Sequence, residues 1–270
     1  NINELNRILE EKSDFNNKLN NCKKPMFIIG ESALELVNGK NIIEKIKEYL
    51  IKKNLINENW NAFNILSQNA STVGAIDMKF YNINESSNFV FFENLEKGQF
   101  KLLYLLGSDN LQIKKNNEFI VYQGSHGDKG AEIADIVLPS PAYTEKEGLY
   151  SNLEGRVQEC RKASYPTGEA LEDWKIFNLI SNKIYGTKLF DSHLSIRKST
   201  LKEIKNFSEI DLLPTKEITK SSNALDNFTE EQVSVNNIDY YFSNSIARAS
   251  KTMSDCRNIG LKNKKNGTNN

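Results

Sequence analysis

The residues with the clearest chemical potential lie at positions 121 to 158, which carry VYQGSHGDKGAEIADIVLPSPAYTEKEGLYSNLEGRVQ. Within this stretch, GSHGDKG offers glycines and backbone N–H donors directly after an apolar run, which is how phosphate-binding turns are built. The segment matches neither GxGxxG nor GxxxxGK followed by Ser or Thr, the two common nucleotide-binding patterns. We therefore favour a tight turn between a strand and a helix, with a nucleotide-type loop as the alternative.

His126, in the same segment, would serve as a general base if Asp128 or Asp135 oriented its ring, because histidine is the side chain most often used for that role. The sequence shows no partner nucleophile at a recognisable spacing from it. This favours a hydrogen-bonded structural histidine over a catalytic one.

Further along, Thr144, Glu145, Glu147 and Glu154 supply a hydroxyl and carboxylates, and Arg156 is able to clamp a carboxylate or a phosphate with two parallel bonds. Paired carboxylates alone are typical of glycosidases. Their sequence context does not support that activity, so we favour a solvated or braced loop.

The elements that must position these residues are short apolar runs that end in Gly or Pro: PMFIIG, KLLYLLG, EFIVYQG and IADIVLP. Each is typical of a buried parallel strand, and the last three release their loops at their carboxyl ends. In a doubly wound sheet these ends are where ligands bind.

Helical periodicity appears in four places. Residues 1 to 22 predict a helical lead-in, and apolar residues at 42, 43, 46, 49 and 50 predict an amphipathic helix after the first strand. The spacing of Trp60, Phe63 and Ser67 predicts a helix over 59 to 74.

A further helix is expected from Thr167, its N-cap, to Gly186, its end. Its expected buried stripe comprises Leu171, Trp174, Phe177, Ile180 and Ile184.

Composition excludes several functions. Lys and Arg number 35 and Asp and Glu number 35, so formal charge is zero and nothing draws the chain to nucleic acid. The apolar runs are shorter than the roughly 20 residues that cross a bilayer, which predicts a soluble or peripheral protein. Cys22, Cys160 and Cys256 form no CxxC pair and only two His are present, which predicts no metal or iron–sulphur site in this chain.

The stretch from Tyr122 to Gln158 resembles the ADxVLP and N-x-EGR region of the molybdopterin oxidoreductase superfamily. Within it, the resemblance is strongest to the large iron–sulphur subunit of respiratory complex I, called the G subunit in bacteria and the 75 kDa subunit in mitochondria. Further matching segments follow the family's order. They are KKPMFIIGESAL, WNAFNILSQNASTVGAIDM, LLYLLGSD, EDWKIFNLIS and, near the end, FSNSIARASKTMSDC.

The resemblance implies an α/β fold, a Rossmann-like and mostly parallel sheet flanked by helices, as in part of a molybdopterin oxidoreductase domain with an irregular C-terminal extension. We expect a helical lead-in over 1–22, the domain over 23–186, an extension over 187–260 that packs on the domain or on partner subunits, and a disordered tail over 261–270. The chain looks like the last part of the family's large domain, so either the gene is split or the chain is a fragment.

In molybdopterin enzymes the region that matches LYSNLEGRVQ helps to line the pterin, whereas the corresponding domain of complex I generally carries no molybdenum cofactor. The resemblance therefore implies that Asn152, Glu154, Gly155 and Arg156 are relics of a pterin site. We expect Gly155 to permit a tight bend and Arg156 and Asn152 to satisfy buried backbone carbonyls. No catalytic and no metal-binding residue is expected.

The expected function is a structural, non-catalytic part of the complex I peripheral arm, on the matrix side of the mitochondrial inner membrane or the cytoplasmic side in a bacterium. Its partners would be other complex I subunits, including the chain or region with the N-terminal iron–sulphur part of the same subunit. FMN and the clusters would lie in those other chains. The alternative is the catalytic half of a molybdopterin-dependent oxidoreductase.

Overall fold

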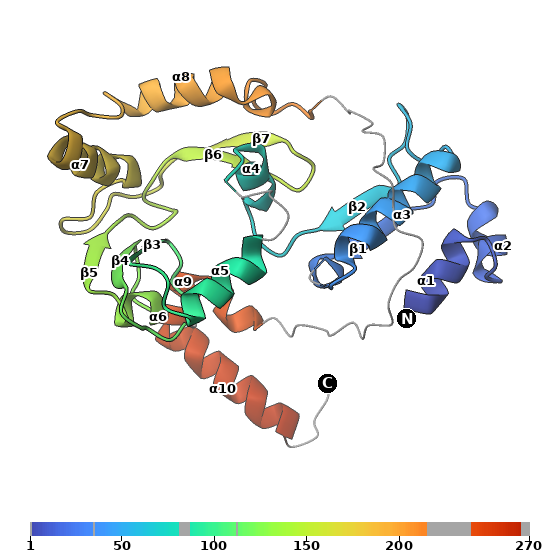
Figure 1. Ribbon diagram of the computed structural model, residues 1–270, viewed down its shortest axis with the longest axis horizontal. Helices are drawn as coiled ribbons and strands as arrows, with labels where there is room; N and C mark the ends of the chain where they lie inside the picture. Colours follow the sequence, from blue (N-terminus) through green and yellow to red (C-terminus); the bar gives the residue numbers. More distant parts are fainter. Residues whose placement is uncertain (1, 35, 81–86, 112, 215–238, 266–270) are drawn as a thin grey trace. The chain divides into compact units, whose positions relative to one another are not determined.

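The computed structural model describes residues 2–34, 36–80, 87–111, 113–214 and 239–265, and it divides the chain into two compact units. Unit 1 comprises Asn1–Ala75, Ser151–Val157 and Asp211–Asn237, and unit 2 comprises Ile76–Tyr150, Gln158–Ile210 and Ile238–Asn270. Figure 1 shows their helices and strands.

Unit 1 is built on a β–α–β unit. Its elements are α1 (Ile2–Leu9), α2 (Phe15–Asn20), β1 (Phe27–Gly30), the 3-10 helix η1 (Glu31–Ala33), α3 (Gly39–Lys52) and β2 (Phe63–Leu66), followed by α4 (Thr72–Asp77), which begins in unit 1 and ends in unit 2. β1 and β2 are parallel, with Phe27 opposite Phe63 and Gly30 opposite Leu66. Because parallel strands cannot be joined by a tight turn, α3 serves as the crossover.

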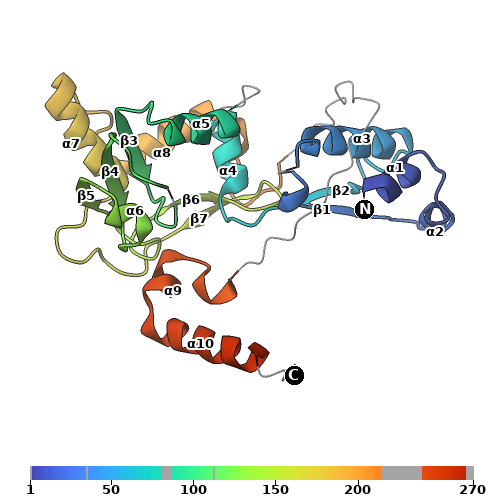
Figure 2. The ribbon, with the colours of Figure 1, turned by 60° about the horizontal axis from the view of Figure 1, so that its bottom comes forward.

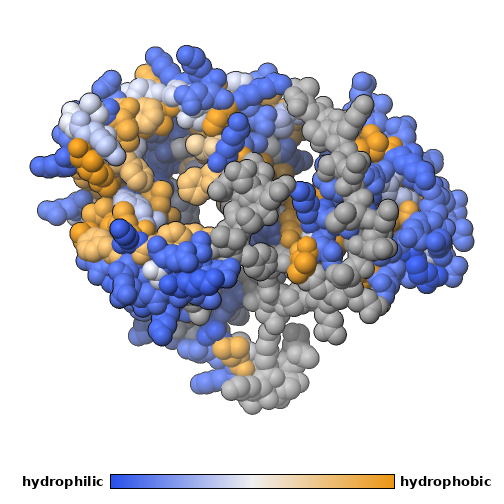
Figure 3. Space-filling view, viewed as in Figure 1, coloured by the Kyte–Doolittle hydropathy of each residue, from blue (hydrophilic) through white to orange (hydrophobic). Residues whose placement is uncertain are grey.

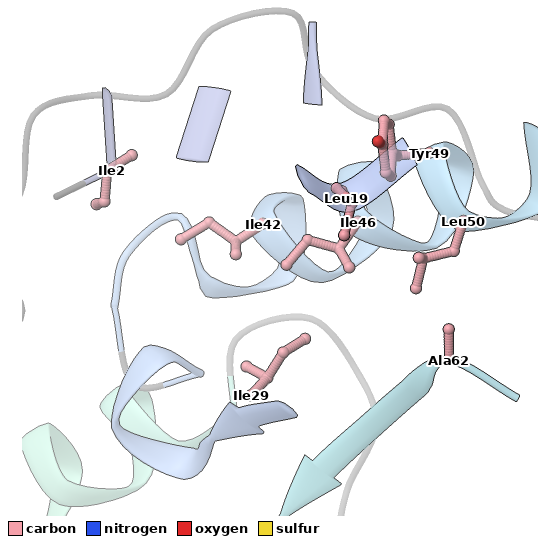
Figure 4. Close-up of a cluster of buried hydrophobic side chains, with 8 residues drawn as sticks. All are labelled: Ile2, Leu19, Ile29, Ile42, Ile46, Tyr49, Leu50 and Ala62. Carbon is pink, nitrogen blue, oxygen red and sulfur yellow. The ribbon is translucent and has the colours of Figure 1, made fainter. Parts of the chain in front are cut away.

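The core of unit 1 lies between α3 and this strand pair. α3 buries Ile42, Ile46, Tyr49 and Leu50, which recur at the steps of one helical face. Figure 4 shows these side chains gathered with Ile29 of β1, Ala62 next to β2, and Ile2 and Leu19 of the first two helices. The helix expected after the first strand is thus confirmed.

The helix expected over 59–74 is wrong, because residues Phe63–Leu66 form β2 and the helix there begins only at Thr72. The side chain of Trp60 supplies one reason, since its Nε1 donates to the carbonyl of Pro25 at 2.9 Å and holds the segment beside β1. Backbone pairing with β1 overrides a coincidental three- and four-residue spacing.

Unit 2 contains a three-stranded parallel sheet in the order β3-β4-β5. Leu103 lies opposite Ile120, and Tyr122 lies opposite Val137. The elements of this part are α5 (Ser87–Glu96), β3 (Leu102–Leu106), β4 (Phe119–Gly124), α6 (Lys129–Glu132), β5 (Ile136–Pro139) and α7 (Asp173–Tyr185). All the strands expected here are confirmed.

Helices cover both faces of this sheet (Figure 2). On one face, Leu103, Leu105, Ile120 and Tyr122 form a buried cluster with Leu95 of α5, and Ala131 of α6 packs against it. On the opposite face, the ring of Tyr104 lies 5.7 Å from that of Phe177 of α7. The fold class expected from the sequence, a parallel α/β arrangement, is confirmed.

α7 begins at Asp173 rather than at Thr167. Gly168 has φ +59°, a left-handed conformation that a right-handed helix excludes, and this bend delays the helix. The expected end is confirmed, since Gly186 is left-handed at the C-cap and its N–H donates to the carbonyl of Asn182. The expected buried stripe is wrong at both ends, because Leu171 lies before the helix and is 40% exposed and Ile184 is 64% exposed. Trp174, Phe177 and Ile180 are half-buried, and the buried residues of α7 are Ile176 and Ser181.

The remaining elements belong to a hairpin and to the C-terminal part. They are β6 (Gly148–Ser151), β7 (Val157–Cys160), α8 (His193–Glu203), η2 (Lys205–Phe207), η3 (Tyr240–Phe242), α9 (Ser245–Ala249) and α10 (Lys251–Lys265). α10 runs into the expected tail as far as Lys265, and 266–270 lie outside the described residues. Within the described ranges, no helix is both long and apolar enough to cross a membrane.

A glycine pair tests the packing of α6. A Cβ on Gly130 would lie 2.5 Å from the carbonyl oxygen of Ser108 in the loop after β3, whereas one on Gly127 would meet nothing within 4 Å. We expect Gly130→Ala to lower the free energy of unfolding by about 1–3 kcal/mol through overpacking. Gly127→Ala should change it by less than about 0.5 kcal/mol. Urea unfolding followed by circular dichroism measures both, and equal effects would contradict the packing described.

Candidate functional site

The carboxyl ends of β3, β4 and β5 define the candidate site in unit 2. Because the three strands are parallel, their following loops leave the sheet at one edge, the position where doubly wound sheets bind ligands. GSHGDKG follows β4 at this edge, as the sequence predicts. Two groups of polar side chains lie here, one on each face of the sheet.

On the face covered by α7, a chain of hydrogen bonds runs through the fully buried Gln123. Its Oε1 accepts from the hydroxyl of Tyr104, and its Nε2 donates to Asp173 at 2.7 Å. The second oxygen of Asp173 accepts from Lys146 at 2.8 Å. Burial and the charge of Asp173 raise the pKa of Tyr104, so the phenol stays a neutral donor.

Sequence reasoning missed this network. The available signal was the position of Gln123 on a strand otherwise made of apolar and aromatic residues, because a buried amide requires partners for its donors and its acceptor. The partner Asp173 lies 50 residues further along the chain, and no local pattern indicates it.

On the opposite face, Tyr122 is 2% exposed and its hydroxyl donates to the carbonyl of His126 at 2.8 Å. Burial raises the pKa of Tyr122 to about 12, with a further contribution from the charges of Asp109 and Asp128. This tyrosine therefore fixes the turn after β4 as a neutral donor.

In the part of the chain that the structure describes, neither Asp128 nor Asp135 bonds to the ring of His126 and orients it for general-base catalysis. Its Nδ1 lies 3.0 Å from the hydroxyl of Ser125. Asp128 is the N-cap of α6, where its Oδ1 accepts from the N–H of Lys129 at 2.9 Å. GSHGDKG thus forms a tight turn whose first helical donor is already used by its own aspartate, which favours the structural interpretation.

Asp135 is also used elsewhere. It accepts from the N–H of Ile120 at 2.8 Å and from Lys115 at 2.6 Å. The bond from Ile120 first, and then that from Lys115, hold the pKa of Asp135 below its usual value. This carboxylate ties the loop before β5 to β4.

The four relic candidates lie in the connection between β6 and β7. The side-chain Oδ1 of Asn152 accepts from the N–H groups of Glu154 and Arg156, each at 2.9 Å. Gly155 has φ +81°, and the guanidinium of Arg156 donates to the carbonyl of Asp211 at 2.7 Å. The bend at Gly155 is as expected. Arg156 bonds to a backbone carbonyl, but Asp211 is exposed rather than buried, and the side chain of Asn152 accepts from amides instead of satisfying carbonyls.

The remaining candidates have structural contacts. Glu145 accepts from the N–H of Ala142 at 3.0 Å, and the carbonyl of Thr144 accepts from Ala163 at 2.8 Å. Glu147 lies 3.5 Å from Nδ1 of His193. These contacts brace the loop after β5, in keeping with the interpretation favoured above.

Glu147 and His193 line a cavity of about 210 Å³ between the β6–β7 hairpin and α8. Its apolar wall includes Leu149 and Ile196. Its polar side contains Arg197, which holds Glu159 by two bonds at 2.9 and 3.1 Å. Because this charge is already paired, the cavity offers a partly open space with mixed lining rather than an unpaired cation.

The three cysteines are free thiols, with Cys22 and Cys256 exposed and Cys160 half-buried. Among the residues that the structure describes, no three or more His, Cys, Asp or Glu side chains are placed to hold a metal ion together.

Comparison with known proteins gives the class of this α/β chain. The family model for molybdopterin oxidoreductase matches residues 1–183, and the chain belongs to that family. A second family model, for the C-terminal part of the G subunit of NADH-ubiquinone oxidoreductase, matches residues 209–256.

Individual relatives show which proteins of this family the chain resembles. The chain is 37% identical over 266 residues to the NADH-ubiquinone oxidoreductase 75 kDa subunit of Reclinomonas americana, a match that covers 96% of this chain and 37% of that protein. It is 36% identical to the G subunit of the NADH-quinone oxidoreductase of Rickettsia typhi, over 87% of this chain and 33% of that one. The chain is also 36% identical to the mitochondrial NADH-ubiquinone oxidoreductase 78 kDa subunit of Candida albicans, over 88% of this chain and 34% of that protein.

The resemblance to the large complex I subunit that the sequence suggests is therefore confirmed. The chain spans about a third of the length of the curated relatives it matches.

Substitution of two glycines tests the hairpin. Gly155 requires φ +81°, and a Cβ there would lie 2.9 Å from Cγ of Pro214, whereas a Cβ on Gly148 of β6 would meet nothing within 4 Å. We expect Gly155→Ala to cost about 1–3 kcal/mol of unfolding free energy, because it combines backbone strain with a clash. Gly148→Ala should cost less than about 1 kcal/mol. Denaturant unfolding compares them, and a silent Gly155→Ala would refute the left-handed bend.

Proposed function

We propose that this chain is a structural, non-catalytic part of the large subunit of respiratory complex I, in its peripheral arm. The complex transfers electrons from NADH to ubiquinone and couples this transfer to proton pumping. The match of residues 209–256 to the C-terminal model of the G subunit carries the proposal. The molybdopterin oxidoreductase match is shared with the catalytic alternative, whereas this C-terminal match favours complex I alone.

The contacts of the relic residues support the non-catalytic half of the proposal. The side chains of Asn152 and Arg156 form hydrogen bonds with backbone groups of their own unit, and Gly155 adopts the left-handed conformation of the bend. These bonds favour a structural role for the hairpin residues over contact with a pterin. Glu154 contributes its backbone N–H to the same turn.

Cofactors and location follow from the same proposal. FMN and the iron–sulphur clusters would be held by other chains of the complex, and this chain would carry none of the transferred electrons. The chain would lie on the matrix side of the mitochondrial inner membrane, or on the cytoplasmic side if its source is bacterial. Relatives of both origins support this placement.

Exposed apolar residues on the parallel sheets indicate where partners would bind. In unit 1, Ile28 is 62% exposed on the face of β1 opposite Ile29, and Leu66 of β2 is 55% exposed. Parallel sheets in globular proteins are normally covered on both faces. A bare apolar face on a parallel sheet is therefore a contact surface.

Unit 2 shows the same feature. On β5, Ile136 is 45% and Val137 is 51% exposed, and Ile184 of α7 is 64% exposed. Figure 3 shows hydrophobic residues on the left of the visible surface, in the region that α7 and β5 occupy in Figure 1. Because the relatives are about three times as long, we assign these surfaces to the rest of the same subunit, which carries its N-terminal iron–sulphur part.

The first test of the proposed function is co-migration. Respiratory membranes from the source organism are gently solubilised and separated by size, and each fraction is assayed for this chain by mass spectrometry, for NADH:ubiquinone activity and for molybdenum. We expect the chain in the active particle without molybdenum. Its absence from that particle would overturn the proposal, and molybdenum in a particle without ubiquinone activity would establish the catalytic alternative.

The second test addresses the contact surfaces. Ile28→Asn and Val137→Asn alter exposed side chains, so each should change the stability of the isolated chain by less than about 1 kcal/mol. Each should nevertheless lower the amount of this chain in the purified complex several-fold. Ile259→Asn, at a residue of α10 that is 60% exposed, is the matched control. Quantitative mass spectrometry against another subunit measures assembly, and losses no larger than in the control would exclude these surfaces.

A further inference from the structure

Arg248 of α9 lies between two aspartates at the carboxyl edge of the unit 2 sheet. Its Nε lies 2.5 Å from Oδ2 of Asp128, and a terminal nitrogen lies 2.9 Å from Oδ1 of Asp109. The arginine side chain is only 16% exposed and each aspartate side chain 20%. One guanidinium thus bridges two carboxylates in a largely desolvated position.

We propose that Asp109 and Asp128 form a guanidinium-binding site at the carboxyl edge of the β3-β4-β5 sheet. Arg248 of the same chain fills this site, and the C-terminal segment that carries Arg248 thereby covers it. We define that segment as residues 239–258. Residues 239–256 of this segment, which include Arg248, lie within the C-terminal family match of 209–256, and the last two residues lie beyond it.

The parallel sheet supplies the site. Asp109 follows β3 and Asp128 follows β4, two adjacent strands, so both carboxylates reach the same edge. Other bonds fix the two loops beforehand, because Asp128 caps α6 through the N–H of Lys129 and the N–H of Gly130 donates to the carbonyl of Asp109 at 3.2 Å. The bonds that hold the two loops together therefore do not involve the guanidinium of Arg248.

The C-terminal segment is a small helical body that presents Arg248. Asn244 caps α9 by accepting from the N–H of Ala247 at 2.8 Å, and the guanidinium of Arg248 also donates to the carbonyl of Phe242 at 3.3 Å. Arg257 of α10 stacks over the ring of Phe242 at 5.0 Å. These internal contacts hold the arginine in the position from which it reaches Asp109 and Asp128.

The chemistry selects arginine. A planar guanidinium presents donors in two directions at once and so spans two separate carboxylates, whereas an ammonium is a compact point charge. At the carboxyl edge, where other doubly wound sheets bind dinucleotides, the position between Asp109 and Asp128 is thus occupied by Arg248.

Carboxylate labelling tests this site on the full chain. A water-soluble carbodiimide with glycine ethyl ester modifies accessible carboxylates, and peptide mass spectrometry gives the rate at each position. We expect Asp109 and Asp128 to react several-fold faster in Arg248→Met than in the unaltered chain. Asp135, which pairs with Lys115 instead, should react equally in both.

Hydrogen–deuterium exchange reports on the segment itself. Arg248→Met should speed the exchange of residues 239–258 by about tenfold or more, because it leaves two carboxylates without their shared partner. Arg248→Lys should give an intermediate value. Arg197→Met, which removes a two-bond pair with Glu159 in the same unit, is the matched control and should leave the segment unchanged.

Unchanged labelling and unchanged exchange in Arg248→Met would overturn the proposal, and so would an equal release of the segment by Arg197→Met. If Arg248→Met does not fold, the same two measurements on Asp128→Asn test the proposal instead. That variant keeps the arginine and the shape of the side chain but removes one of the two charges, so it should release the segment in part and expose Asp109.

Discussion

Parallel strand pairing is the constraint on which the rest of this structure depends. A parallel pair cannot be closed by a tight turn, so each strand must be followed by a crossover that returns the chain to the same end of the sheet. α3 fills this role between β1 and β2, and the short α6 lies in the connection between β4 and β5. As a consequence, all strands of a sheet release their loops at one edge, where Asp109 and Asp128 meet although they belong to different loops.

The same constraint explains why so much apolar surface remains exposed. Parallel sheets are stable when both faces are covered, and a two-stranded sheet such as β1–β2 has little area of its own to bury. α3 covers one face through Ile46 and Leu50, while Ile28 points to the other. A chain about a third as long as its relatives would have these surfaces if the remainder of the protein supplies the missing cover.

The sequence predicted those elements whose signals are local. Apolar runs ending in glycine gave the strands correctly, and Gly186 marked the end of α7 because only a left-handed residue suits that position. The prediction failed where a distant partner decides the outcome: Phe63 joins a strand because β1 lies beside it. Gln123 and Asp173, or Asp128 and Arg248, are separated by 50 and 120 residues, so no spacing pattern joins them.

At the sheet edge, the polar side chains bond to groups of the same unit, which supports the non-catalytic role proposed above. A catalytic or cofactor-binding group needs a side chain with bonding capacity left for a ligand, whereas here Asp128 serves both a helix cap and a guanidinium. Desolvated carboxylates beside the buried Tyr122 would repel each other and raise the energy of the folded chain if they stood alone. Arg248 offsets that repulsion and lowers the pKa of Tyr122 against the effect of both aspartates. Through Arg248, the C-terminal segment is therefore part of the electrostatic balance of the sheet edge.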